Sequence, residues 1–370
     1  MFKVRKKLPS VESVKEIFPL TSKLAKIKQA RDTELKDILL PGAPSGKFIL
    51  IVGPCSAHCI DATLAYCYEI AKIADKVKDK LFIVPRIFTS KSRSGLGYKG
   101  LVHGGLSHGF SNSEFTSHDT GGFGMVEGVL NQREVHYRVL AETGLSGADE
   151  LVYLDLFEYI ADLVSYVSIG ARASDSQSHR LFASGLNTPV GIKNNLAGRL
   201  DYLNYALDVA HSPQEFSAGG YAVKSKGNKL AHAVLRGYID SAGNHMPNYA
   251  LDTVLKLIEQ QVNSKHQNNN INNNQLINNI ESGRATSIII DASHSNSKKV
   301  AKNQIAVVGN IIANIKSNTT YKNTVKGIML ESFIEGGQDK AAKTFGKSVT
   351  DDCLNLQDTK NLILKLADNI

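Results

Sequence analysis

The segment that decides the fold is Phe48–Ser56, FILIVGPCS, in which five apolar residues run directly into a Gly-Pro turn and a cysteine. A short apolar run without polar alternation predicts a strand buried on both faces, which is typical of parallel strands covered by helices. Seven further runs of this kind follow along the chain: Leu81–Phe88, Glu150–Leu154, Val167–Ala171, Val190–Ile192, Ala231–Leu235, Ser287–Ile290 and Val325–Leu330.

Helical segments separate many of these runs. Ile60–Asp79 shows this best, because its apolar residues recur every three or four positions along one face. Eight parallel strands that alternate with helices over about 320 residues predict a (β/α)8 barrel. A doubly wound open sheet is the structural alternative, and counting strands does not exclude it.

The first 47 residues precede this pattern, and we expect a helical extension there. Ser10 is a suitable cap for a first short helix, and Leu24–Leu39 is amphipathic. Prolines with neighbouring glycines then interrupt the helix before Phe48. We therefore expect two parts: residues 1–47, acting in oligomerisation or regulation, and residues 48–370, forming a catalytic barrel. The apolar face of the extension suggests a homo-oligomer, either a dimer or a tetramer.

The bulk composition excludes several classes of protein. The chain has 42% hydrophobic residues and a net charge of +8, with lysines and arginines spread along its length. This spread argues against a nucleic-acid-binding surface. The four cysteines form no C-x-x-C pair and are too few for a disulfide framework. Neither a signal-peptide core nor an apolar run of about 18 residues occurs, so we expect a soluble cytoplasmic protein that binds no membrane.

Two segments depart from the alternating pattern. Gln267–Asn279 is rich in asparagine and joins a helix to a strand, which in a barrel is the face opposite the active site. We expect a flexible, dispensable loop there. His103–Phe123 is rich in Gly, Ser and His and begins at the catalytic face. A metal role for its histidines (His103, His108 or His118) is one hypothesis, and a mobile loop with solvated imidazoles is the one we favour.

Cationic side chains follow most of the predicted strands. Lysines and arginines gathered at one face of a barrel would repel one another and lose hydration, and an anionic ligand offsets both costs. A substrate with phosphate and carboxylate groups suits arginine, which pairs with either group through two hydrogen bonds. Taken singly, each cation is as easily explained as a solvated loop charge, but the whole set favours an anionic substrate. Its members are Arg86, Lys91, Arg93, Lys99, Arg172, Lys193 and Arg236.

At these residues the chain resembles the type I 3-deoxy-D-arabino-heptulosonate 7-phosphate (DAHP) synthases, the first enzymes of the shikimate pathway. The resemblance extends from about Lys6 to the C-terminus and rests on many short motifs in family order. They are Gly53-Pro54-Cys55-Ser56, Gly97-Tyr98-Lys99-Gly100-Leu101, Ile169-Gly170-Ala171-Arg172, Ser184-Gly185-Leu186, Pro189-Val190-Gly191-Ile192-Lys193-Asn194, Leu235-Arg236-Gly237, Asp291-Ala292-Ser293-His294-Ser295-Asn296-Ser297, Glu331-Ser332 with Glu335-Gly336, and Gly346-Lys347-Ser348-Val349-Thr350-Asp351.

The resemblance implies a barrel with an N-terminal extension and a divalent metal ion held by four residues, namely Cys55, His294, Glu331 and Asp351. Thiolate, imidazole and carboxylate donors suit Mn, Fe, Co or Zn better than Mg or Ca. For Cys55 alone, a buried inert thiol would be the better interpretation. The resemblance also implies that cations hold phosphoenolpyruvate beside Glu150: Arg86, Lys91, Lys99, Arg172, Lys193 and Arg236. The stretch Lys91-Ser92-Arg93-Ser94 matches the family's sequence stretch that contacts erythrose 4-phosphate. The resemblance also places Asp351 among the substrate-binding residues.

The implied activity is a metal-dependent condensation of phosphoenolpyruvate with erythrose 4-phosphate, which gives DAHP and phosphate. In this hypothesis the metal ion, held in part by Cys55 and His294, polarises the aldehyde oxygen, and C3 of phosphoenolpyruvate attacks the aldehyde carbon. Lys91 is the candidate proton donor to the forming alkoxide.

Several departures from the family bear on the second substrate or on regulation. Ser92 replaces a proline, His103–Phe123 is longer than the usual loop, and Phe216–Leu230 looks shorter and altered where the family has a hairpin. A different aldose phosphate is therefore an alternative substrate. Leu151–Tyr159 also departs from the family near its feedback site, which leaves inhibition by an aromatic amino acid open. From another functional class, the alternative is a non-catalytic paralogue that binds metabolites or a partner enzyme.

Overall fold

Eight parallel strands form the centre of the molecule in a computed structural model of the chain. The structure describes all residues except 1–3, 5, 41–45, 105–123 and 266–285. The predicted loops at His103–Phe123 (after Gly104) and Gln267–Asn279 therefore lie outside the described residues. The strands are β1 (Phe48–Gly53), β2 (Leu81–Pro85), β3 (Ala148–Glu150), β4 (Tyr166–Ile169), β5 (Val190–Lys193), β8 (Ala231–Leu235), β11 (Ile288–Asp291) and β12 (Val325–Glu331).

The strand order shows that the sheet is a barrel. Neighbouring strands pair in the order β2-β1-β12-β11-β8-β5-β4-β3, and all of these pairs are parallel. A bridge between Arg86 and Ala148 then joins the two outer strands, and the Ile87 amide donates to the Ala148 carbonyl at 2.9 Å. This closure confirms the predicted (β/α)8 barrel and excludes the doubly wound open sheet.

Two predicted strands differ from the observed ones. The third run was expected at Glu150–Leu154, whereas β3 spans Ala148–Glu150, and Leu154–Tyr159 forms a 3-10 helix, η2. The expectation was wrong because the charged Asp149 interrupts the apolar pattern inside the strand. The second run was expected to reach Phe88, but β2 ends at Pro85 and continues only through the Arg86 bridge.

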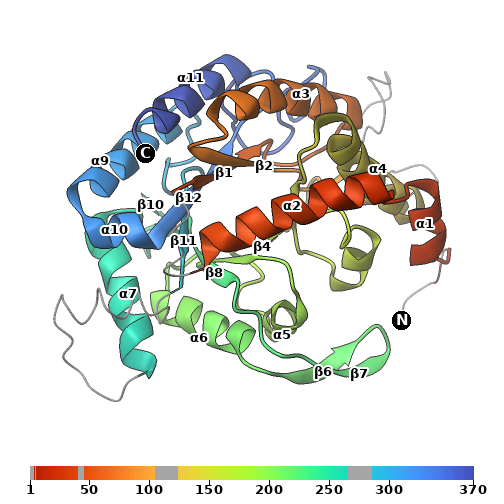
Figure 1. Cartoon of the computed structure of the whole chain (residues 1–370), viewed down its shortest axis with the longest axis horizontal. Helices are drawn as coiled ribbons and strands as arrows, with labels where there is room; N and C mark the ends of the chain where they lie inside the picture. The colour runs from red at the N-terminus through yellow and green to blue at the C-terminus, as the bar shows by residue number, and fades with distance from the viewer. Residues whose placement is uncertain (1–3, 5, 41–45, 105–123, 266–285) are drawn as a thin grey trace.

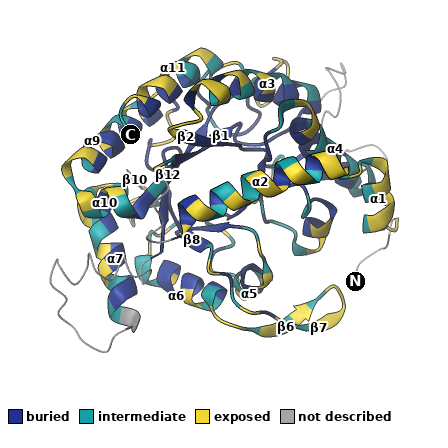
Figure 2. Ribbon diagram, viewed as in Figure 1, coloured by how far each residue is buried: buried dark blue, intermediate teal, exposed yellow. Residues whose placement is uncertain are grey.

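Helices surround the barrel and carry their apolar faces inward (Figures 1 and 2). α3 (Ile60–Val77) confirms the clearest helix prediction. The other outer helices are α4 (Gly124–Thr143), α5 (Gln177–Gly185), α6 (Leu200–His211), α7 (Leu251–Lys265), α9 (Asn303–Ser317), α10 (Thr319–Thr324) and α11 (Leu356–Ala367). None of the helices in the described part of the chain is long and apolar enough to cross a bilayer.

Two short hairpins and a 3-10 turn, η1 (Leu101–His103), complete the described elements. One hairpin, β6 (Glu215–Ala218) with β7 (Tyr221–Lys224), falls in the segment that looked altered in the sequence, so a hairpin is present there. The other, β9 (Tyr238–Ile239) with β10 (His245–Met246), follows β8.

The N-terminal segment forms two helices, α1 (Val11–Ile17) and α2 (Ser22–Leu39). α2 lies across the barrel opening in Figure 1. Two of its hydrogen bonds reach residues that directly precede strands: Asp32 accepts from Ser165 before β4, and the Leu39 carbonyl accepts from Ser287 before β11. α2 therefore covers the amino-terminal ends of the strands, opposite the face where a barrel carries its active site.

The barrel interior and the buried side of α2 share one apolar cluster. It combines Leu35, Ile38 and Leu39 with inward side chains of the strands: Ile49, Ile51, Phe82, Val84, Phe88, Ala148, Tyr166, Val234, Ile289 and Met329. The apolar face of α2 is thus occupied within the chain and does not require a second subunit. The expected homo-oligomer stays a prediction.

Candidate active site

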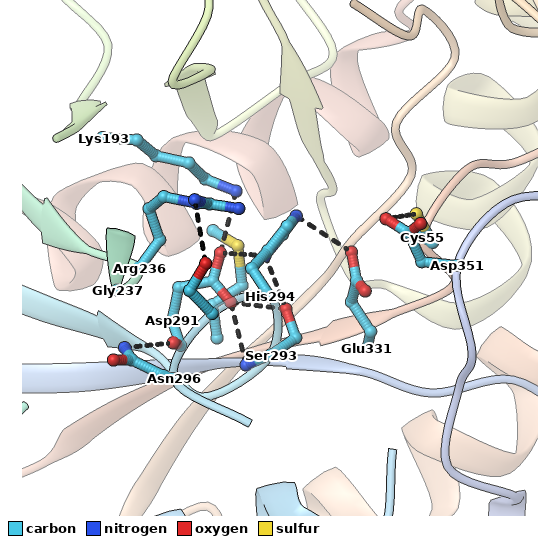
Figure 3. A network of polar contacts seen from close by, with 12 residues as sticks. Cys55, Lys193, Arg236, Gly237, Asp291, Ser293, His294, Asn296, Glu331 and Asp351 are labelled. Atoms are coloured by element: carbon cyan, nitrogen blue, oxygen red, sulfur yellow. Dashed lines mark hydrogen bonds and ion pairs between the residues drawn. The ribbon is translucent and has the colours of Figure 1, made fainter. Parts of the chain in front are cut away.

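The carboxyl ends of β1 and β12 bring the predicted metal ligands together (Figure 3). Cys55 follows β1, Glu331 ends β12, and Asp351 lies in the loop before α11. Ligand atoms of these three residues all lie within 4.8 Å of one another. His294, which follows β11, places Nε2 3.6 Å from Oε1 of Glu331. Cys55, Glu331 and Asp351 therefore gather one sulfur and carboxylate oxygens in one group, and His294 adds a nitrogen beside Glu331. Such a donor set fits a divalent ion of the Mn to Zn class.

The Cys55 thiol is completely buried and lies between a cation and an anion. Nζ of Lys91 is 2.8 Å from Sγ and 3.1 Å from the Cys55 carbonyl oxygen, and Sγ is 3.4 Å from Oδ2 of Asp351. Burial and the charge of Glu331 raise the pKa of the Cys55 thiol to about 12, against the opposing effect of Lys91. The thiol therefore keeps its proton near neutral pH unless a metal ion displaces it.

Arg86 holds Cys55 and Glu331 in position through hydrogen bonds. Its guanidinium donates to the carbonyl oxygens of Pro54 and Cys55, both at 3.1 Å, and to Oε1 of Glu331 at 2.8 Å. The side chain is only 1% exposed and lies over the ring of Phe88. Arg86 was predicted to hold phosphoenolpyruvate, and that role stays a prediction. In the structure its nitrogens bind protein groups and orient two of the predicted metal ligands, Cys55 and Glu331.

Asp291 links the metal ligands to the cations, a role that the sequence did not reveal. Its Oδ2 accepts from Nζ of Lys193 and from Nδ1 of His294, each at 2.9 Å, and its Oδ1 accepts from Ser293 (Figure 3). Burial opposes ionisation of Asp291, but His294 and Lys193 outweigh it and hold the pKa of Asp291 well below its usual range. Since Nδ1 faces Asp291, Nε2 of His294 faces Glu331. The i, i+3 spacing of Asp291 and His294 was the available signal.

A cavity of about 200 Å³ opens beside these residues. Its lining includes many of the predicted substrate residues, namely Lys91, Ser92, Arg93, Ser94, Arg172, Arg236, His294 and Asp351, together with Gly95, Leu96 and Lys299. Five of these side chains are cationic and one is a carboxylate, so the cavity carries a positive field that suits an anionic ligand. Burial opposes the charge of Asp351, yet Lys91 and His294 hold the pKa of this carboxyl well below its usual value.

The structure does not bring every predicted residue to the cavity wall. Lys193 lies beneath it, paired with Asp291, and Lys99 is exposed, although its carbonyl accepts from the Lys91 amide at 2.8 Å. The Glu150 carboxylate packs on Gly170, where a Cβ would lie 2.1 Å from Oε1, so a larger residue at this position would displace the carboxylate. Lys299, which does line the cavity, was not predicted. It adopts a left-handed backbone (φ 58°) after Lys298 (φ 53°), and sequence patterns give no sign of this.

Within the described residues, other regions add no competing metal site. Of the loop histidines, His108 and His118 lie outside the described residues, and Nε2 of His103 is 2.6 Å from the Tyr153 hydroxyl. Where side chains are described, the grouped metal-capable residues are Cys55, Glu331 and Asp351. A larger hollow of about 670 Å³ lies beside α2, at the other end of the barrel, and none of the predicted site residues lines it.

Residues 41–364 match the DAHP synthetase I family. This chain belongs to that family. A relative from Salmonella typhimurium, the Tyr-sensitive phospho-2-dehydro-3-deoxyheptonate aldolase, is 30% identical over 97% of this chain and 92% of its own length. The Phe-sensitive protein of that name from Escherichia coli K12 is 29% identical over 99% and 95%. A solved structure of the protein of that name from Francisella tularensis aligns with a TM-score of 0.83 and 26% identity, over 100% of this chain and 98% of its own.

Membership of the DAHP synthetase I family confirms the resemblance inferred from the motifs. The solved relative also agrees with the barrel, because its similarity extends over the whole chain. The N-terminal helices precede the barrel, as expected.

Proposed function

We propose that this chain condenses phosphoenolpyruvate with erythrose 4-phosphate to give DAHP and inorganic phosphate. The single observation that supports this most strongly is a cation-lined cavity directly beside the cluster of Cys55, Glu331 and Asp351. The relatives carry the name phospho-2-dehydro-3-deoxyheptonate aldolase, which denotes the same product.

The cations suit a substrate with a carboxylate and a phosphate at opposite ends. Arg236 is 4% exposed and reaches the cavity wall, where it would pair with one anionic group of phosphoenolpyruvate. Arg172 lines the same cavity, with Nε 2.5 Å from the Ser94 hydroxyl, and would pair with the other. Lys193 and Lys99 add charge around them. Because Lys193 is shared with Asp291, binding of the substrate would also hold the loop that carries His294.

The donor set at the base of the cavity favours a divalent ion of the Mn, Fe, Co or Zn class. Cys55, His294, Glu331 and Asp351 would hold it, and such an ion supplies Lewis acidity toward an aldehyde oxygen. The residues themselves prepare this site. Asp291 sets the orientation of His294, and Arg86 sets that of Glu331.

The reaction forms one carbon–carbon bond, and at C2 it replaces the carbon–oxygen bond to phosphate with one to an oxygen from water. C3 of phosphoenolpyruvate attacks the aldehyde carbon of the sugar phosphate, and Lys91 donates a proton to the forming alkoxide. Water adds at C2 and releases a proton that restores Lys91. Phosphate then leaves with the bridging oxygen and takes the proton of the new C2 hydroxyl, which becomes the ketone. Lys91 is suited to the proton transfer because it lines the cavity while its Nζ lies 2.8 Å from the Cys55 sulfur.

A different aldose phosphate is the second candidate substrate. The observation that favours it is the loop at Ser92, Arg93 and Ser94, which lines the cavity. In this loop Ser92 replaces a proline of the DAHP synthase family. Arg93 and Ser94 are exposed, so this part of the wall is open to solvent. An open wall accepts sugars of different length more readily than a closed one.

The test is phosphate release from phosphoenolpyruvate with three-, four- and five-carbon aldose phosphates, after titration with Mn²⁺, Co²⁺ and Zn²⁺. Turnover that is fastest with erythrose 4-phosphate supports the proposal. Faster turnover with another aldose replaces the substrate but keeps the reaction class. Phosphoenolpyruvate binding without turnover on any aldose would instead favour a metabolite-binding paralogue.

A further inference from the structure

Lys91 depends on a loop rather than a strand for its position. β2 ends at Pro85, and the chain runs six residues further before Lys91 turns back to the Cys55 carbonyl. Hydrogen bonds hold this loop at successive points. The Phe88 carbonyl accepts from the Ala57 amide at 2.9 Å, and the Lys91 amide donates to the Lys99 carbonyl at 2.8 Å. Between these two points lies Thr89.

Thr89 is tied to a single carboxylate, that of Asp149. Its amide donates to Oδ1 at 2.8 Å, and its hydroxyl donates to Oδ2 at 2.5 Å. The Thr89 carbonyl accepts from the Val102 amide at 3.2 Å, and a Cβ at Gly100 would lie 2.3 Å from that same oxygen. Asp149 on one side and the backbone of Gly100 and Val102 on the other therefore leave Thr89 no room to move independently. A shift of the Asp149 carboxylate would thus move the whole loop.

Asp149 lies behind the barrel wall and not in the cavity. Its neighbour Ala148 points into the barrel interior, and alternation along β3 directs Asp149 outward, toward α4. The side chain is 2% exposed and is absent from the cavity lining. It accepts from Nε2 of His136 at 3.1 Å, from Gln132 at 3.3 Å and from the Glu150 amide at 2.7 Å.

A buried carboxylate with five donors is a costly arrangement for a barrel to maintain, because each donor must be placed to offset its lost hydration. An apolar residue would serve the packing between β3 and α4 without these requirements. His136 is itself fully buried, and its Nδ1 has no hydrogen-bond partner in the described structure, which assigns the proton to Nε2, facing Asp149. His136 therefore fixes the carboxylate, and the carboxylate fixes Thr89.

We propose that Asp149, oriented by His136, is a positioning residue that sets the reach of Lys91 toward Cys55 and the cavity. The inference rests on the proposed function, in which Lys91 donates a proton to the forming alkoxide. Asp149 touches no substrate and acts through Thr89 and the backbone of residues 89–91. A displacement of about 1 Å in a catalytic group lowers a rate by roughly 100-fold, so a modest movement of this loop has a large effect.

The first test compares Thr89→Val with Thr89→Ser. Valine has the shape of threonine without the hydroxyl, whereas serine keeps the donor to Asp149. We expect Thr89→Val to lower kcat by roughly 10- to 100-fold with an almost unchanged KM for phosphoenolpyruvate, and Thr89→Ser to stay close to the wild type. Asp162→Asn, which breaks the Arg133 pair away from the cavity, is the control for lost stability without lost rate. Equal kcat values for the valine and serine variants would overturn the inference.

The second test is a double-mutant cycle. Asp149→Asn should lower kcat in the wild type but add nothing in a Lys91→Met background, because residues that act as one unit are not additive. An equal fold-loss of kcat in both backgrounds would show that Asp149 does not act through Lys91.

A crystal structure of Thr89→Val separates this inference from the proposed function. Lys91 Nζ displaced from Cys55 supports the positioning role even if the wild type does not turn over erythrose 4-phosphate. An unmoved Lys91 overturns the role, whatever the activity.

Discussion

Oδ2 of Asp291 and Nδ1 of His294 lie 2.9 Å apart, and the same carboxylate oxygen accepts from Lys193 at 2.9 Å. A carboxylate that orients a metal-binding imidazole is usually worth 10- to 100-fold in metal affinity. Here the same group also neutralises a cation that was predicted to hold phosphoenolpyruvate. Under the proposed function, metal binding and substrate binding would therefore both depend on one buried side chain.

We expect Asp291→Asn to weaken metal binding by roughly 10- to 100-fold and to raise the KM for phosphoenolpyruvate at saturating metal. The amide keeps the shape of the carboxylate but loses its charge, so both Lys193 and His294 lose a partner. Isothermal titration calorimetry with the metal ion measures the change in metal affinity independently of activity. Asp175→Asn, an exposed carboxylate after β4 that contacts Asn195, is the matched control. Unchanged metal affinity in Asp291→Asn would contradict the coupling.

Cys55→Ala should abolish tight metal binding and most phosphate release. The variant removes the only sulfur donor of the described ligand group. Cys67→Ala is the control, because Cys67 is buried on α3 and lies outside that group. Metal content after dialysis and the phosphate-release rate give the two readouts. Full activity in Cys55→Ala would exclude a role for this thiol in the reaction.

Truncation of the α2 side chains that enter the barrel should destabilise the whole protein. Leu35 is fully buried beneath the strands, and Leu→Ala changes at such sites cost about 2–5 kcal/mol. Thermal or urea unfolding measures the loss. Ile17→Ala on α1 is the control, because Ile17 is 59% exposed and should change stability little. Similar stabilities of the two variants would show that α2 does not contribute to the barrel and would favour a separate role for residues 1–47.

Acid should weaken the fold through two buried histidines. Burial lowers the pKa of His58 and of His232 to about 4, below the value of about 6.5 in an unfolded chain. Between these values the unfolded state binds more protons than the folded one. The stability contributed by each neutral histidine is therefore fully present above about pH 6.5 and is lost as the pH falls toward 4. The loss at pH 5 is about 2 kcal/mol per histidine.

His232→Asn tests this dependence. The variant loses the hydrogen bond to the Tyr166 hydroxyl and should be less stable at pH 8. Its stability should nevertheless fall less steeply than that of the wild type between pH 7 and 5, as measured by urea unfolding at each pH. Parallel curves for the two proteins would exclude His232 as a source of the acid sensitivity.

Most of the fold could be predicted because parallel strands buried on both faces leave an unbroken apolar run. The third strand could not be placed, because Asp149 interrupts the run and is stabilised by partners that come from α4 and the loop after β2. The position of α2 was also hidden. The amphipathic pattern of Leu24–Leu39 shows that one face is covered, but not that the barrel interior covers it.

The site was predictable where residues follow strands directly. Arg172 and Arg236 line the cavity as expected from their motifs. Asp351 also lines it, but it lies in the loop before α11, so its motif and not its position after a strand made it predictable. Residues whose role depends on distant partners were missed: Asp291 acts through Lys193, which is 98 positions away, and Lys299 enters the cavity through a left-handed backbone. No local pattern in a sequence encodes either relationship.

The packing of α2 against the barrel interior affects how the protein folds during synthesis. Leu35, Ile38 and Leu39 leave the ribosome before any strand, yet they share one buried cluster with Ile289 and Met329 from the last two strands. Contacts between residues this far apart along a chain slow folding, because the intervening loop must close before they form. During synthesis the apolar face of α2 therefore stays exposed until the barrel strands have been made. In that interval chaperones can bind it, or it can promote aggregation. α2 can complete its docking only after β12 has emerged.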